Sequence, residues 1–448
     1  MRAWHIRGSL ARVVAGPVVG SVAGCMAACM AGVAAAEPAI EAEPADSHEV
    51  GSPSVSLIGA SSGSGASAGA EPIEIAPRKP LFPVPRSISD ANFDSDGDWM
   101  DDASPLTVSE GDFSISIGAS LQFRYTGSWA PAAPDTDPEL GFQFRRLRPV
   151  LRGSGVDGKL KFGIQTEANG NGDVDLLDAW VSFQITDELR FRTGRFNLQY
   201  DRELITSSSY LPMVERSVLS NTLNVDAANR VEGVEFRYEQ EIQRLTVTFG
   251  EGLGVTGTAF NDSRSDWGIT GRYERLLIGD DFKQQTQITA PRGTPRSLML
   301  GFAAHQQHLH GLGERFSATT DLTYKHDGFN ATLALGAQVS EDRNGPVFRE
   351  PEHDWGMTLG SGYYITERVE PFARLELGTT SGPMHPDLAI FTTGFNWYIL
   401  GQALKFSTDF SVAFNGIGPA FDRAADGFIE TPDGDHRYVW RAQIQMLF

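Results

Sequence analysis

The last thirteen residues, 436–448, read HRYVWRAQIQMLF, and this stretch decides the fold class. Apolar side chains occupy every second position from Tyr438 to Phe448, while Arg441, Gln443 and Gln445 occupy positions between them. A period of two indicates a β-strand with one apolar face and one polar face. The chain ends on an aromatic residue in the middle of this pattern, with no following element to cover the apolar face.

This ending is similar to the C-terminal strand of Gram-negative outer-membrane barrels, where a terminal Phe is the assembly signal. The alternative is a strand whose apolar face is buried in a soluble β-sandwich. Many strands with the same two-faced pattern precede residue 436, and they favour the barrel.

Alternation of the same kind recurs from residue 113 onward, for example in 160–165, 234–238, 331–338 and 404–412. About sixteen such segments are present, and an even number of strands closes an antiparallel barrel. The mean hydropathy is -0.23 and no apolar run has the length of a membrane helix. We therefore expect an all-β fold, a transmembrane antiparallel β-barrel of about 16 strands, over residues 112–448.

The connections between these segments support a barrel because they alternate between short turns and longer loops. Short turns are predicted near 155–158, 186–187, 326–328, 366–367 and 401–403, and longer loops near 128–141, 198–229, 340–353, 379–388 and 415–435. The stretch 277–296 departs from this rule, because it falls on the turn side and is long. It is either an inserted segment or a missed strand.

The N-terminal part predicts export. Residues 1–36 combine arginines, an apolar small-residue segment and an Ala-Ala-Ala end, which is typical of a secretory signal peptide cleaved after Ala36. Both cysteines, Cys25 and Cys29, lie in it, and Cys25 also offers a lipid-anchor motif as an alternative. Residues 37–111, rich in Ala, Glu, Pro, Ser and Gly, are predicted to be a low-complexity acidic periplasmic linker.

Charged side chains on the polar faces of the strands are candidates for the pore lining. Arginines are locally in excess: four of them, including Arg152, lie within eight residues. Strict alternation does not allow all four to face the lumen. Arginine suits an anion path because it stays charged and presents planar donors to oxyanions. The candidates are Arg145, Arg146, Arg148, Lys159, Lys161, Arg190, Arg192, Arg195 and Arg237. For any one of them, an ion pair that rigidifies the wall is the competing interpretation.

The connection 197–229 mixes apolar and charged residues, and a loop of this length is usually functional or disordered. Its apolar content favours a third loop that folds back into the lumen and narrows the pore. Its charged residues, Arg202, Glu203, Glu215 and Arg216, are the candidate constriction residues.

Five ordered segments resemble the phosphate-selective porin O and P family: 142–148 (FQFRRLR), 160–167, 178–181 (DAWV), 192–196 (RTGRF) and 215–217 (ERS). The resemblance implies a sixteen-stranded trimeric porin, an inward third loop, an arginine-rich anion path and a lysine-based phosphate site. Residues 197–229 contain no lysine, which departs from the family pattern. General anion passage is still expected, whereas the lysine-based phosphate selectivity of the family does not carry over to this loop.

The sequence thus predicts a passive channel for small hydrophilic solutes, leaning to anions such as phosphate, and not an enzyme. Expected partners are outer-membrane lipids, the barrel assembly machinery acting on Phe448, and two further copies in a homotrimer. No cofactor or metal is expected. A net charge of -20 without basic clusters flanked by aromatics argues against nucleic acid. The alternatives are an esterase-like enzyme, for which His305, His308 and His310 in an expected surface loop offer a base or a metal site, and a purely structural or anchoring barrel.

Overall fold

The computed structural model describes residues 106–448 with gaps. The gaps are 132–136, 169–171, 224–229, 253–264, 310–312, 341–351 and 381–387, and within 415–435 only Ile417, Phe421, Ala425 and 427–429 are described. The expected signal peptide, both cysteines and the linker up to residue 105 lie outside the described residues.

Seventeen strands make up the sheet in the described part of the chain. The first nine are β1 (Leu106–Glu110), β2 (Phe113–Trp129), β3 (Glu139–Gly155), β4 (Leu160–Ala168), β5 (Val174–Gln184), β6 (Leu189–Asn197), β7 (Arg230–Gln240), β8 (Gln243–Gly250) and β9 (Ser265–Ile278). The others are β10 (Ser297–Leu309), β11 (Gly313–His326), β12 (Phe329–Ser340), β13 (Glu352–Tyr363), β14 (Val369–Thr380), β15 (Leu388–Leu400), β16 (Leu404–Ala413) and β17 (Arg437–Leu447).

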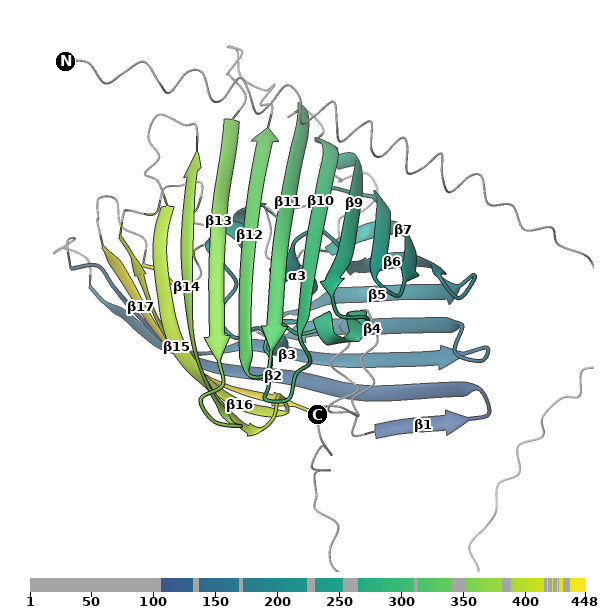
Figure 1. Ribbon diagram of the computed structural model, residues 1–448, viewed down its shortest axis with the longest axis horizontal. Helices are drawn as coiled ribbons and strands as arrows, with labels where there is room; N and C mark the ends of the chain where they lie inside the picture. The colour runs from purple at the N-terminus through teal and green to yellow at the C-terminus, as the bar shows by residue number, and fades with distance from the viewer. Residues whose placement is uncertain are drawn as a thin grey trace, which may run out of the picture. The chain divides into compact units, whose positions relative to one another are not determined.

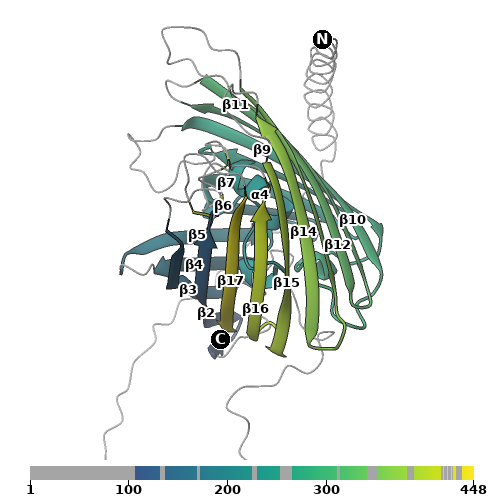
Figure 2. The ribbon, with the colours of Figure 1, turned by 90° about the vertical axis from the view of Figure 1, so that its left-hand side faces the viewer.

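Strands β2 to β17 form a closed antiparallel barrel of 16 strands. Each pairs with the next along the chain, and β17 pairs with β2, with Trp440 opposite Gly127 (Figures 1 and 2). The short strand β1 pairs with the start of β2. Because β1 falls inside the range 37–111 assigned to the linker, the end of that range is a strand rather than an unstructured tail.

The strand pattern separates an apolar outer face from a polar inner face. In β17 the side chains of Trp440, Ile444 and Met446 are about two-fifths exposed, whereas Arg441 and Gln445 between them are buried. Phe142 on β3 is 71% exposed, which is typical of a surface that faces lipid. The predicted all-β, 16-stranded transmembrane barrel is therefore confirmed.

The connections between strands alternate between the two ends of the barrel. The end that carries the short turns, such as 155–158 and 326–328, is called the turn end, and the opposite end, with the longer connections, is called the loop end. The exceptional stretch is an insertion and not a missed strand. Residues 279–296, the inserted turn, join β9 to β10 through the short helix η3 (Phe282–Gln285). Lys325 on β11 donates from Nζ to the carbonyl oxygens of Gln284 and Gln287, which ties this turn to the wall.

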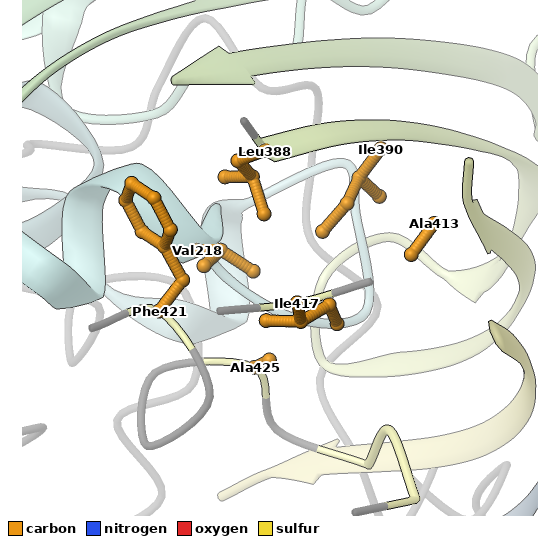
Figure 3. Close-up of a cluster of buried hydrophobic side chains, with 7 residues drawn as sticks. All are labelled: Val218, Leu388, Ile390, Ala413, Ile417, Phe421 and Ala425. Carbon is orange, nitrogen blue, oxygen red and sulfur yellow. The ribbon is translucent and has the colours of Figure 1, made fainter. Parts of the chain in front are cut away.

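The connection between β6 and β7 also runs against the inner wall. Within residues 198–223, the inward segment, lie α3 (Arg202–Ile205), η2 (Ser208–Tyr210) and α4 (Val218–Leu223). Val218 packs with Leu388 and Ile390 of β15 and with Phe421 of the β16–β17 connection (Figure 3). Among the described residues, none of the helices is long and apolar enough to cross a membrane.

Candidate functional site

A β-bulge on β3 explains how neighbouring arginines share one face. Gln122 of β2 pairs with Arg146, but the next residue, Phe123, pairs with Phe144, so Arg145 is the extra residue. Arg145 and Arg146 both contact the inward segment, and alternation beyond the bulge keeps Arg148 on the same face. The expectation was that Arg145, Arg146, Arg148 and Arg152 could not all face the lumen; the bulge brings the first three to one face, which strict alternation does not allow.

Wall side chains donate hydrogen bonds to the backbone carbonyls of the inward segment from several strands. Lys405 Nζ of β16 lies 2.9 Å from the Ser209 oxygen and 3.2 Å from the Leu211 oxygen. Asn396 of β15 donates to the Pro212 oxygen at 2.8 Å, and Arg374 of β14 donates to the Glu215 oxygen at 2.8 Å. Arg272 of β9 donates to the Tyr200 oxygen at 2.9 Å.

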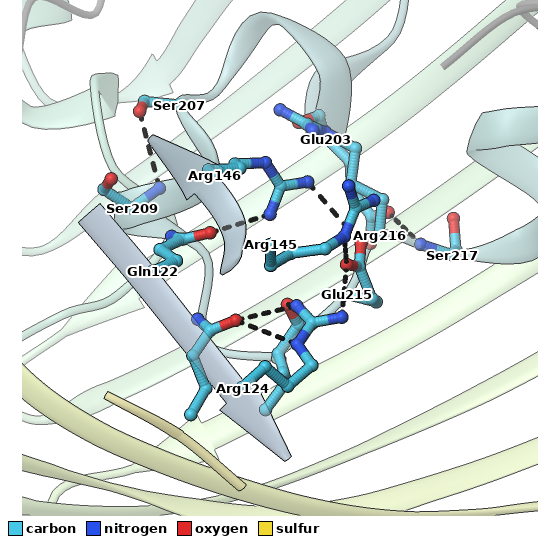
Figure 4. A network of polar contacts seen from close by, with 12 residues as sticks. Gln122, Arg124, Arg145, Arg146, Glu203, Ser207, Ser209, Glu215, Arg216 and Ser217 are labelled. Carbon is cyan, nitrogen blue, oxygen red and sulfur yellow. Dashed lines mark hydrogen bonds and ion pairs between the residues drawn. The ribbon is translucent and has the colours of Figure 1, made fainter. Parts of the chain in front are cut away.

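Donors from β9, β14, β15 and β16 surround the segment, so it occupies the lumen between them. The carboxylate of Glu215, on this segment, is shared by three guanidinium groups (Figure 4). Its Oε1 lies 2.7 Å from Arg124 NH1 and 2.6 Å from Arg145 Nε, and its Oε2 lies 3.6 Å from Arg146 NH2. Burial opposes ionisation of Glu215, but the three arginines outweigh it and hold its pKa well below the usual range. Glu215 is therefore a carboxylate at neutral pH. We call these four residues the Glu215 cluster.

Neighbouring amides fix the orientation of two of these arginines. Gln122 Oε1 accepts from Arg146 NH1 at 2.8 Å, and Gln443 Oε1 accepts from Arg124 Nε at 3.0 Å and NH2 at 2.7 Å. Gln122 in turn donates to Gln445 at 2.9 Å. Arg124 was not among the residues predicted from the sequence, although its alternation with Phe123 and Tyr125 in β2 marks it as inward-facing.

A second group with the same composition lies on β6 and β7. The carboxylate of Glu235 is 2.8 Å from Arg192, 3.8 Å from Arg190 and 3.7 Å from Arg237, and all four side chains are buried. Arg190 and Arg237 line a cavity of about 710 Å³ at the turn end together with six acidic residues, among them Asp187. We call Arg190, Arg192, Arg237 and Glu235 the Glu235 cluster. Its four side chains carry a net charge of +2.

The remaining predicted pore-lining residues are spread along the same side of the barrel. Arg148 makes a two-pronged pair with Glu167 at 2.8 and 3.2 Å, and Arg195 lies 3.5 Å from Glu232. Lys161 is half-buried on β4, whereas Lys159 is exposed in the turn before it. Lys159 therefore lies at the turn end of the barrel and not along its wall.

The other predicted constriction residues organise the inward segment itself. Arg216 donates to the Glu203 and Thr206 carbonyl oxygens, each at 3.0 Å, and the Glu203 carboxylate accepts from the Ser217 N–H at 2.7 Å. Arg202 is buried and donates to the Gln285 carbonyl of the inserted turn. Of the four, Glu215 is the one whose side chain meets the arginines of β2 and β3.

Two of the three histidines, His305 and His308, lie on a strand and not in the expected surface loop. His305 is buried within β10, where its ring bonds Thr270 Oγ1 at 2.7 Å and Gln307 Oε1 at 2.8 Å, and His308 is on the same strand. His310 lies outside the described residues. In the part of the chain that the structure describes, no three His, Cys, Asp or Glu side chains are grouped as metal ligands.

Comparison with known proteins supports the resemblance. Residues 118–276 match the family model "Phosphate-selective porin O and P", so the recognition made from the sequence is confirmed over that range. No curated protein matches the chain.

The fold is that of solved outer-membrane barrels. An anion-selective porin from Comamonas acidovorans is 15% identical with a TM-score of 0.53, covering 75% of this chain and all of that one. The outer-membrane channel DcaP of Acinetobacter baumannii is 11% identical with a TM-score of 0.52, covering 75% of this chain and 99% of that one. OmpT of Vibrio cholerae is 10% identical with a TM-score of 0.50, covering 77% and 100%. At these identities the likeness concerns the fold alone.

Proposed function

We propose, from the match of residues 118–276 to the phosphate-selective porin O and P family, that this chain is a passive outer-membrane channel for small hydrophilic solutes that prefers anions. The observation that carries the proposal is the pair of arginine groups on the inner wall, the Glu215 cluster and the Glu235 cluster. Each has three guanidinium groups around one carboxylate. A wall with such charge lowers the energy of an anion relative to a cation.

Selectivity would come from these charges and from the space that the inward segment leaves beside them. No nucleotide or covalent chemistry is involved, so solutes move down their own gradients. An acidic residue that is paired with a basic residue on the wall, as Glu167 is with Arg148, does not oppose the proposed anion preference at the constriction.

Phosphate is one anion that such a wall would accept, and the support for it comes from the family match. Because residues 197–229 contain no lysine, guanidinium groups would replace the lysines expected from the family. Guanidinium groups bind phosphate and carboxylate oxygens alike, so this replacement favours a general anion path over a phosphate filter.

Location and partners follow from the same proposal. Export would use residues 1–36 as the signal peptide, with 37–105 as a periplasmic linker, and the apolar outer face would contact lipid. Phe448 exchanges backbone hydrogen bonds with Ala119 of β2 at 2.5 and 3.0 Å, which extends the pairing of β17 with β2. Recognition of Phe448 by the barrel assembly machinery is part of the proposal. A homotrimer is proposed from the family.

The test is the zero-current potential of the purified protein in a planar bilayer under a KCl gradient, repeated with phosphate added. An anion-selective potential is expected, with block by phosphate if phosphate binds. A cation-selective potential would refute the preference for anions and keep the channel. The absence of any conductance would favour a structural barrel or, if an esterase assay is positive, an enzyme.

A further inference from the structure

Two of the three arginines of the Glu215 cluster, Arg124 and Arg146, are also held by side chains other than Glu215. Gln443 accepts two hydrogen bonds from Arg124, and Gln122 orients Arg146, as described above. Gln122 is itself held by Gln445 on the next strand, at 2.9 Å. A site whose donors are fixed in advance by neighbouring side chains retains its geometry when its ligand leaves.

The backbone of the inward segment is likewise anchored without the Glu215 carboxylate. Upstream, Lys405 and Asn396 hold the carbonyls of residues 209–212. Downstream, the Val218 N–H donates to the Glu376 carboxylate at 2.7 Å, and Arg374 holds the backbone oxygen of Glu215. Rotation of one side chain is therefore enough to free the arginines.

The surroundings of Glu215 would let a solute replace its carboxylate on the arginines. The Arg145 side chain is 23% exposed, compared with 2% for Arg124, so an entering solute meets Arg145 first. Glu215 and Arg374 line the same small cavity, and Arg374 already contacts Glu376 at 2.9 Å and Glu203 at 3.7 Å, so a displaced Glu215 carboxylate would share this cation with them. With the neighbouring Arg148–Glu167 pair included, the group of four arginines and two glutamates carries a net charge of +2.

We propose that Glu215 is a tethered ligand of a carboxylate-binding site formed by Arg124, Arg145 and Arg146, and that small carboxylates are solutes of this channel that take its place in transit. The occupant defines the ligand class, because the site is filled by a carboxylate with two short charge-assisted bonds, at 2.6 and 2.7 Å. This inference rests on the proposed channel function and names its substrate class. Passage through the site would exchange one carboxylate for another without leaving the arginines unpaired.

The experiment compares Glu215→Gln with the wild type, using propionate, the free analogue of the glutamate side chain, as the probe and inorganic phosphate as the comparator. A tethered competitor acts at millimolar effective concentration or above, so its removal should lower the half-blocking propionate concentration by at least about tenfold in single-channel recordings. Adding Arg145→Gln to Glu215→Gln should reverse this gain. Retention of the barrel is checked by heat-dependent mobility on a denaturing gel.

Glu274→Gln is the matched control. Glu274 is also a buried wall glutamate in contact with two arginines, Arg244 at 3.2 Å and Arg272 at 3.1 Å, and its substitution adds the same charge elsewhere in the lumen. Propionate block in this variant should stay within about twofold of the wild type, since no tethered competitor is removed.

Equal block in Glu215→Gln and the wild type, or a gain confined to phosphate, would overturn the carboxylate assignment. An equal gain in Glu274→Gln would overturn it too, because the effect would then be one of net charge. Calorimetric titration of Glu215→Gln with propionate in detergent separates the two proposals. Binding without conductance would refute the channel and keep the site, whereas conductance without binding would refute the site and keep the channel.

Discussion

Lys405 donates to two backbone carbonyls of the inward segment, and Lys405→Met tests whether it anchors the proposed constriction. Lys405 is 2% exposed, and its ammonium donates to the Ser209 and Leu211 carbonyl oxygens at 2.9 and 3.2 Å. Each hydrogen bond from a charged donor contributes roughly 1.5–3 kcal/mol, so the two together contribute about 3–6 kcal/mol. Removing the ammonium also removes its burial cost, which offsets part of the loss.

We expect a net loss of about 3 kcal/mol of the free energy that holds residues 207–212 against β16. A change of this size raises the ratio of detached to attached segment by roughly 100-fold. Single-channel recordings in planar bilayers should then show a higher mean conductance and frequent transitions between levels, where the wild type shows one dominant level.

Lys325→Met is the matched control for this prediction. Its ammonium is also buried and also donates to two backbone carbonyls, but these belong to the inserted turn. Transitions in Lys405→Met that are absent from Lys325→Met would assign the effect to the inward segment. Identical current histograms for Lys405→Met and the wild type would refute the reasoning that this lysine anchors the constriction.

Three further substitutions test Asp201 at the start of the inward segment, the Glu235 cluster, and the pairing of β5 with β6. Burial, with repulsion from Glu203, raises the pKa of Asp201 to about 6, so the folded chain keeps a proton that the unfolded chain loses near 3.8. The free energy of unfolding in urea should therefore fall by about 2 kcal/mol between pH 4 and 7 relative to Asp201→Asn, and a difference that does not vary with pH would contradict this. Arg192→Gln lowers the net charge of the Glu235 cluster from +2 to +1 and should shift the zero-current potential toward cation selectivity, whereas an unchanged potential would place this cluster off the ion path. Gly194 has a φ of +116° and a Cβ there would overlap the Ala179 carbonyl oxygen, so Gly194→Ala should cost about 3 kcal/mol or more and reduce the folded fraction in a refolding assay, and normal refolding would argue against this tight strand pairing.

The strands and their faces could be predicted because the information is local. A period of two is set by the backbone geometry of each strand, so the inward position of Arg192 and the outward position of Trp440 follow from their neighbours in sequence. The number of strands and the long third connection follow from the same pattern. The absence of lysine from residues 197–229 can also be read from the sequence alone.

The Glu215 cluster could not be predicted because it depends on contacts between distant parts of the chain. The bulge at Arg145 is a register shift between two strands, and strict alternation cannot show which residue is extra. Glu215 lies 91 residues from Arg124 and 70 from Arg145, and it reaches them only because the inward segment enters a closed lumen. Likewise, the sequence left 277–296 as an insertion or a strand, and the direct pairing of β9 with β10 decided that it is an insertion. Alternation within each strand determined which side chains face the lumen, whereas barrel closure determined which of them meet, because closure brings opposite walls and the inward segment together.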